Sequence, residues 1–344
     1  MLKKIALSKL QEFLAALMAQ GKLYAPVNGQ GGINFEEIKK AEDVTLDFYN
    51  TVLSPKALFF PQIEQMVRYR MEKEKTETDI VPPDSSPQIL LGVRPCDVKS
   101  FEIMDLLFED SGILDPYWVE RRKNTTIIGY AFDSVDPADF YNTFGIHAAD
   151  PSGSDIFMIK KGDQEILLKA ITEKGKALLN TVACLEDGTE TDAGYFDEVI
   201  AKGPDLKTRK LDLAGVDRRL LEIFESPFWN KISAACLSCG TCTFACPTCH
   251  CFDICDENLF RKGTRSRTWD ACMFTNFTLE ASGHNVRTKV HQRLRQKVNH
   301  KFSYYVSKFG TNLCVGCGRC TRSCPVNIDI FSIVEGAKKI ESGK

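Results

Sequence analysis

The chain has 344 residues, of which 43% are hydrophobic and 26% charged, enough for one or two domains with buried cores. Its formal net charge of −2 gives no signal for nucleic-acid binding, and no apolar run reaches the roughly 20 residues of a membrane helix. Lys9 and Glu12 interrupt the apolar stretch near the N-terminus, so no secretory signal peptide is predicted. Fourteen cysteines are the unusual feature. In a long chain without such a signal they indicate a cytoplasmic, metal-binding protein.

The first 225 residues alternate between strand and helix patterns. Runs of apolar residues bounded by turn-forming residues predict strands over residues 23–27, 89–93, 125–132, 155–159 and 165–171. Apolar residues at helical spacing predict helices over residues 10–17, 97–108 and 213–224. Asp97 is the expected cap of the second of these helices. This part of the chain therefore has the pattern of a mixed α/β domain.

Two copies of the motif C-x2-C-x2-C-x3-C-P dominate the rest of the chain. Their cysteines are Cys236, Cys239, Cys242 and Cys246, then Cys314, Cys317, Cys320 and Cys324. Bacterial two-cluster ferredoxins hold [4Fe-4S] clusters at this spacing, and the cysteine before proline serves the other cluster. The sequence therefore predicts cluster 1 on Cys236, Cys239, Cys242 and Cys324, and cluster 2 on Cys314, Cys317, Cys320 and Cys246.

Other interpretations of these cysteines fit less well. Zinc usually takes two separated cysteine pairs, not two triads that are each followed by Cys-Pro. Cys242, Cys246 and Cys249 match the spacing of radical-SAM enzymes, but this match overlaps the ferredoxin motif. No pattern of a (β/α) barrel follows it, so the two-cluster interpretation is preferred.

Ser226-Pro227 marks the predicted boundary between two domains. The predicted fold class is α+β: a mixed α/β docking domain over residues 1–225, then a mainly helical two-[4Fe-4S] ferredoxin-like domain over residues 226–344. This second domain contains a long insert, residues 247–313, and a helical stripe formed by Leu294, Val298, Phe302 and Tyr305.

The insert is basic. Between residues 261 and 308 there are eleven lysines and arginines, opposed only by Asp270 and Glu280. Two interpretations stay open. The cations could form a solvated helix surface, or they could offset the negative charge of thiolate-bound clusters or dock a partner.

Several sequence segments are more specific than the general ferredoxin motif: residues 91–97 (LGVRPCD), 246–253 (CPTCHCFD), 269–273 (WDACM), 283–285 (GHN) and 314–320 (CVGCGRC). With these segments the chain resembles the iron–sulfur β-subunit family of cytoplasmic [NiFe] sulfhydrogenases. The same family includes an iron–sulfur component of anaerobic sulfite reductase and the dicluster subunit of flavin oxidoreductases linked to heterodisulfide reductase. The resemblance is strong from Cys236 to Asp329 and patchier before that.

The resemblance implies an electron-transfer subunit of an anaerobic oxidoreductase complex, without catalytic residues of its own. One implied partner is a flavin subunit, similar to ferredoxin–NADP reductase, that oxidises NAD(P)H. The other is a catalytic redox subunit of the hydrogenase, sulfite reductase or heterodisulfide reductase type. Neither nucleic acid nor membrane insertion is expected. The glycine loop at residues 28–32 lacks a dinucleotide fingerprint, so no NAD or FAD is expected on this chain.

Four further cysteines match family positions, and they predict a third [4Fe-4S] cluster on Cys96, Cys249, Cys251 and Cys272. Cys96 follows a predicted strand, and strand ends are where open α/β sheets place sites. The alternative is that these are buried structural thiols. A second functional hypothesis makes this site catalytic, so that the chain itself would reduce a sulfur compound there. Cys184 and Cys255 have no predicted metal role.

Overall fold

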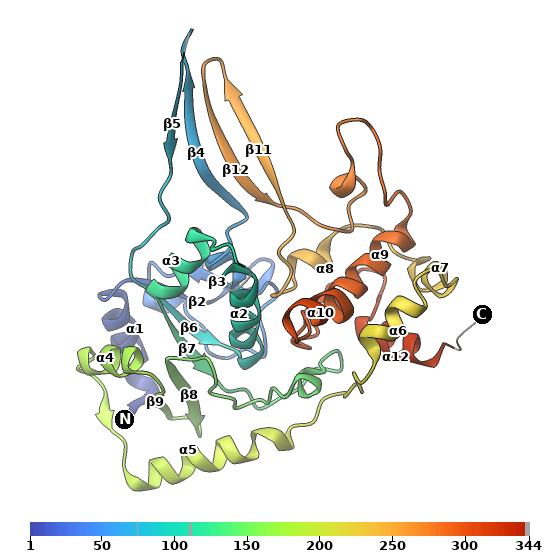
Figure 1. The fold of residues 1–344 in the computed structure, drawn as a ribbon. Helices are drawn as coiled ribbons and strands as arrows, with labels where there is room; N and C mark the ends of the chain where they lie inside the picture. The colour runs from blue at the N-terminus through green and yellow to red at the C-terminus, as the bar shows by residue number, and fades with distance from the viewer. Residues whose placement is uncertain (74, 110–111, 341–344) are drawn as a thin grey trace.

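The computed structural model describes residues 1–73, 75–109 and 112–340, and its larger sheet has eight strands (Figure 1). In spatial order these are β10 (Glu186–Asp187), β1 (Leu2–Ala6), β9 (Glu165–Ala170), β8 (Ile156–Lys161), β7 (Thr125–Tyr130), β6 (Gln88–Val93), β2 (Lys22–Gly29) and β3 (Gly32–Glu37). The four strands from β8 to β2 are parallel, and the outer pairings are antiparallel.

Helices cover both faces of this sheet because alternate residues of its central strands point in opposite directions. Ile89 and Leu91 of β6 pack into a core with α1 (Leu10–Met18) and α4 (Glu173–Thr181). Leu90 points the other way, into a core with α2 (Pro95–Phe108) and α3 (Pro116–Asn124). A further helix, α5 (Glu190–Lys202), packs Phe196 against β8 and β9.

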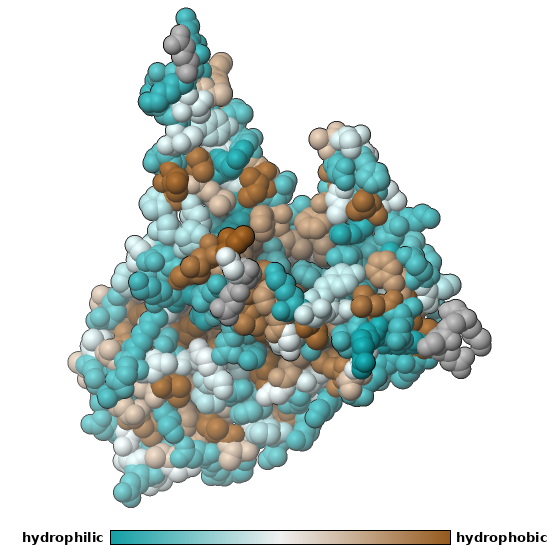
Figure 2. All heavy atoms as spheres, in the orientation of Figure 1, coloured by the Kyte–Doolittle hydropathy of each residue, from teal (hydrophilic) through white to brown (hydrophobic). Residues whose placement is uncertain are grey.

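A second, four-stranded sheet forms an arm that projects from the body of the molecule (Figures 1 and 2). Its strands, in spatial order, are β11 (Phe252–Leu259), β12 (Lys262–Trp269), β4 (Ile63–Met71) and β5 (Thr76–Ile80). One hairpin comes from each of the two predicted domains, and β12 pairs antiparallel with β4. At the base, the buried Arg267 forms ion pairs with Glu64 and Asp115. No sequence pattern predicted this arm.

Apart from β11 and β12, the C-terminal region contains short helices, some of which pack beside α2 (Figure 1). They are α6 (Val216–Glu222), α7 (Phe228–Ser233), α8 (Thr241–Phe244), α9 (Val290–Asn299), a π-helix (His300–Tyr304), α10 (Tyr305–Phe309), α11 (Arg319–Arg322) and α12 (Ile330–Lys339). The predicted helical stripe over residues 294–305 is confirmed and buried. Because the same region contributes β11 and β12, a mainly helical domain is not confirmed. The boundary at residue 225 stays a prediction, and α6 packs across it against α12.

The predicted strands and helices of the first 225 residues correspond to β2, β6, β7, β8, β9, α1, α2 and α6. The predicted cap of α2 was wrong. The helix begins at Pro95, after Arg94, which makes no capping side-chain bond. Asp97 lies inside the first turn, and its carboxylate pairs with Arg319 instead. No helix in the described part of the chain is long and apolar enough to span a membrane.

Candidate metal centres

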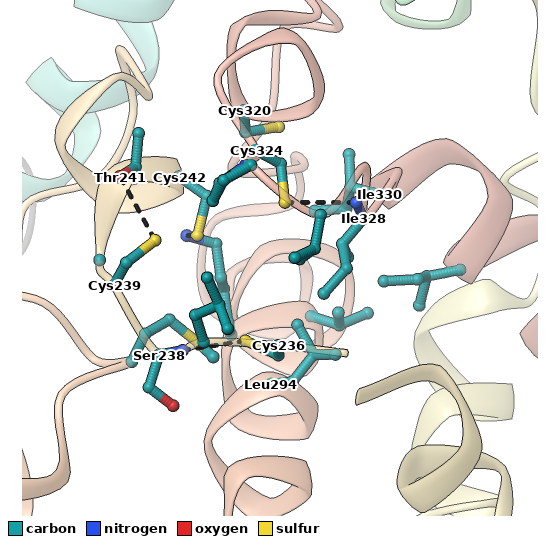
Figure 3. Close-up of a pocket in the computed structure, with 18 residues that line it drawn as sticks. Cys236, Ser238, Cys239, Thr241, Cys242, Leu294, Cys320, Cys324, Ile328 and Ile330 are labelled. Atoms are coloured by element: carbon teal, nitrogen blue, oxygen red, sulfur yellow. Dashed lines mark hydrogen bonds between the residues drawn. The ribbon is translucent and has the colours of Figure 1, made fainter. Parts of the chain in front are cut away.

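The first cysteine motif surrounds a cavity of about 50 Å³ (Figure 3). Its lining includes the four residues predicted for cluster 1, Cys236, Cys239, Cys242 and Cys324, together with Cys320. Apolar side chains complete the wall: Leu294, Val298, Ile330 and Ile333. The backbone N–H of Ser238 donates to Cys236 Sγ at 3.4 Å, and that of Ile328 to Cys324 Sγ at 3.2 Å. The structure therefore brings together thiols from both motifs, with donors that favour the thiolate form.

A glycine shapes the loop of the first motif. Gly240 has a φ of +76°, a left-handed conformation that precedes α8. A Cβ atom at this position would lie 2.6 Å from the ring of Phe274. The tight turn between Cys239 and Cys242 therefore requires glycine.

The residues predicted for cluster 2 lie deeper in the molecule. Cys314 and Cys317 of the second motif are buried, and so is Cys246 of the first. Burial raises the pKa of Cys320 well above its ordinary value, and the negative charges of Cys246, Cys314 and Cys317 raise it further. Lys301 joins the two segments, because it donates to Cys246 Sγ at 3.2 Å and to the carbonyl oxygen of Leu313, the residue before Cys314, at 2.9 Å. Iron must displace the protons of these thiols, as in other metal sites that bind thiolates.

The cysteines are not arranged for a single metal ion. Within the described residues, no three His, Cys, Asp or Glu side chains are placed to hold one ion together. A tetrahedral zinc site needs four ligands that converge on one point. A cubane cluster instead presents a separate iron to each thiolate, so the sulfur atoms stand around a larger body. The thiols of both motifs that line the cavity, Cys236, Cys239, Cys242 and Cys324, are the donor type that [4Fe-4S] clusters use.

Three buried lysines surround these cysteines. Lys56, Lys297 and Lys301 are between 2% and 4% exposed. Lys56 donates to the carbonyl oxygens of Thr243, Cys246 and Cys249 at 2.9–3.2 Å. Lysine is almost never fully buried without a partner, so the three charges require nearby anions.

Cysteine sulfur atoms are the groups whose negative charge, in the thiolate form, acts on these lysines. Burial would lower the pKa of Lys301, but the charges of Cys246 and Cys249 raise it above its ordinary value. The pKa of Lys297 is raised in the same way, against burial, by Cys242 and Cys249. For Lys56 the effect of burial is the largest and lowers the pKa to about 8, although the negative charges of Cys249 and Cys246 act to raise it. Thiolate-bound clusters at these residues would supply the negative charge that neutral thiols lack.

Three of the four cysteines of the predicted third cluster act on one another. Cys251 shares a sulfur hydrogen bond with Cys272, which raises the pKa of Cys251, and the negative charges of Cys272 and Cys249 raise it further. Cys249 in turn shares a sulfur hydrogen bond with Cys246 of the first motif. Burial raises the pKa of Cys96, and the next strongest effects come from Asp97 and Cys317. Cys96 thus lies beside the second motif. The third cluster stays a prediction. Cys184 and Cys255 are half-buried, and Cys255 lies in the arm.

Two residues that support the site had no predicted role. Lys56, in the 3-10 turn Pro55–Leu58, is an isolated lysine without any sequence signal. Arg319 is part of the CVGCGRC segment, but nothing in the sequence identifies its partner, Asp97. By contrast, Lys297 and Lys301 belong to the basic stretch. For these two, the interpretation as a solvated surface was wrong.

Comparison with known proteins agrees with this geometry. A family model described as a 4Fe-4S dicluster domain matches residues 235–328, a range that contains all eight ferredoxin-type cysteines. The chain is 31% identical over 329 residues to sulfhydrogenase 2 subunit beta of Pyrococcus furiosus, which covers 95% of this chain and 96% of that protein. No solved structure matches. The chain therefore belongs to the iron–sulfur β-subunit family of sulfhydrogenases.

Proposed function

We propose that this chain, an iron–sulfur electron-transfer subunit, relays electrons between two partners, of which one is an NAD(P)H-linked flavin subunit. The other, catalytic partner would be a redox subunit of the hydrogenase, sulfite reductase or heterodisulfide reductase type. The observation that carries the proposal is the position of Cys324. It belongs to the second motif yet lines the cavity of the first, so the two motifs form one continuous unit. [4Fe-4S] clusters held there would supply one-electron redox chemistry.

The two sites differ in their access to a partner. Cys239 of the first motif is exposed, and the neighbouring Leu237 is 65% exposed. In the second motif Cys314 and Cys317 are both buried. The first motif is therefore the point at which electrons would pass to or from another subunit. The relative is named as subunit beta, which is consistent with an assembly of several subunits.

The proposed ligand sets are those predicted from the spacing. Cluster 1 uses Cys236, Cys239, Cys242 and Cys324, and cluster 2 uses Cys314, Cys317, Cys320 and Cys246. The third set, Cys96, Cys249, Cys251 and Cys272, is tested by iron analysis of the anaerobically purified chain. About twelve iron atoms per chain would support a third cluster, and about eight would contradict it.

Activity of the isolated chain separates a relay from a reductase. The chain is purified anaerobically, reduced with a dye and mixed with sulfite, polysulfide or a disulfide. A relay takes up electrons from the dye and reduces none of these compounds until a catalytic partner is added. Steady turnover by the chain alone would contradict the relay and favour the reductase hypothesis.

A further inference from the structure

Two buried lysines, four residues apart on one helix, contact two cysteines that are also four residues apart. Lys297 and Lys301 are four residues apart in the continuous helix formed by α9 and the π-helix, so they share one side. Cys242 and Cys246 are also four residues apart, at α8 and just after it. Lys297 Nζ lies 3.1 Å from Cys242 Sγ, and Lys301 Nζ lies 3.2 Å from Cys246 Sγ. Each lysine therefore contacts a cysteine proposed for a different cluster.

Additional hydrogen bonds fix both ammonium groups. Lys297 also donates to Thr243 Oγ1 at 3.0 Å. Lys301 donates to Thr248 Oγ1 at 3.1 Å and to the carbonyl oxygen of Leu313 at 2.9 Å. These oxygens are neutral, so the sulfur atom is the one acceptor in each set that can carry a negative charge, as a metal-bound thiolate does. The positive charges are thereby held against the thiolates instead of reaching solvent.

An arginine of the arm shows the more common arrangement of a basic side chain, an exposed pair with a carboxylate. Arg265 of β12 is exposed and pairs with the carboxylate of Asp256 at 2.7 Å. Lys297 and Lys301 are 4% and 2% exposed and face cysteines instead. Burying an ammonium ion without compensation is costly, so a negative charge on the sulfur stabilises this arrangement.

We propose that Lys297 and Lys301 set the reduction potentials of the two clusters, Lys297 through Cys242 of cluster 1 and Lys301 through Cys246 of cluster 2. This inference rests on the proposed function and on its ligand sets. Reduction adds one electron to a site, taken in the test from dithionite, and no bond or proton is exchanged. A fixed positive charge and a hydrogen bond to a ligand sulfur both stabilise the added negative charge. Both lysines therefore raise the potential of their own site.

The test is a potentiometric titration of the whole, anaerobically purified chain, followed by electron paramagnetic resonance. Lys297→Met and Lys301→Met remove one charge each. Each substitution is expected to lower one midpoint potential by at least a tenfold change in the reduction equilibrium, about 59 mV for one electron. The two variants are expected to shift different signals. Lys308→Met, at an exposed lysine of α10, is the matched control and shifts neither signal.

Iron content distinguishes this inference from the proposed function. If both Met variants keep the wild-type iron content with unchanged midpoint potentials, the inference fails and the relay stands. If a Met variant loses its cluster, the arginine variant at the same position is measured. Retention of the cluster in Lys297→Arg or Lys301→Arg supports the requirement for charge, whereas loss in the arginine variant as well overturns it. A wild-type chain without iron–sulfur clusters would instead contradict the proposed function.

Discussion

Arg319 and Asp97 form a fully buried ion pair that joins the second cysteine motif to the α/β domain. Arg319 Nη1 lies 2.5 Å from Asp97 Oδ1, and Nη2 lies 2.7 Å from Oδ2. Arg319 also donates to the carbonyl oxygen of Thr51 at 2.8 Å. Because Asp97 sits in the first turn of α2, the pair fixes the loop of Cys317 and Cys320 against the large sheet.

Breaking this pair is expected to destabilise the chain strongly. Asp97→Asn leaves the guanidinium of Arg319 buried without a counter-charge, which costs about 3–5 kcal/mol of unfolding free energy. Denaturation by urea under anaerobic conditions measures the loss. The matched control is Glu198→Gln, in the exposed pair with Lys202, which should leave stability unchanged. A similar loss of unfolding free energy in Asp97→Asn and Glu198→Gln would contradict the stabilising role of the buried pair.

Cys324→Ser tests the crossed assignment of ligands. Since Cys324 lines the cavity of the first motif, its loss should abolish the same electron paramagnetic resonance signal that Cys236→Ser abolishes. Cys184→Ser, at a half-buried thiol without a proposed metal role, should keep the wild-type spectrum. Loss of the signal that Cys314→Ser abolishes would show that each motif binds its own cluster.

Lys56→Met tests how the α/β domain supports the cluster loops. The substitution removes donors to the carbonyl oxygens of Thr243, Cys246 and Cys249 and leaves these acceptors unsatisfied. Each lost bond to a charged donor is worth about 1.5–3 kcal/mol. We expect lower iron content after purification and faster loss of iron in air, both measured by colorimetric iron analysis. Lys9→Met, at an exposed lysine, serves as the control, and equal iron retention in both variants would exclude this supporting role for Lys56.

The stability of α12 is expected to depend on pH through Asp329. Burial would raise the pKa of Asp329, but hydrogen bonds from Arg209 and Ser332 hold it below its ordinary value. A lowered carboxyl pKa contributes stability above the unfolded value, about 3.9, and this contribution is lost as pH falls below it. Asp329→Asn should therefore cost about 1 kcal/mol at pH 8 and at pH 6, a value reduced for partial exposure.

Urea denaturation of both chains at pH 8, 6 and 4 measures this difference. The gap between wild type and Asp329→Asn should be equal at pH 8 and pH 6 and should begin to narrow at pH 4. The asparagine can still accept the capping bond from the N–H of Phe331, so the cap of α12 is kept in the variant. A gap that widens as the pH falls would mean that the carboxylate is not stabilised in the folded state.

Features that depend on local pattern could be predicted from the sequence. The strands β6 and β7 are short apolar runs that are buried on both sides, and they lie where the pattern placed them. The arm could not be predicted in this way. All residues of β5 are exposed, so this strand shows no burial alternation. Its sheet depends on the pairing of β4 with β12, about 200 residues further along the chain.

The same division holds for the candidate site. The spacing within each motif is local, and it identified all eight ferredoxin-type cysteines. The contacts of Lys56 with the loop of Cys246 and of Asp97 with Arg319 join residues that are 190 and 222 positions apart. No periodicity marks such contacts. Asp97 illustrates the consequence, because its position near a helix start suggested a cap while the folded chain uses it for a distant ion pair.

The most direct test of the two-cluster relay is a potentiometric titration, followed by electron paramagnetic resonance, of the anaerobically purified wild-type chain and of the variants Cys236→Ser and Cys314→Ser. We predict at least two separate one-electron [4Fe-4S] signals in the wild type, one lost in each variant. A chain whose cysteines hold zinc, or a single signal that disappears in both variants, would contradict the relay.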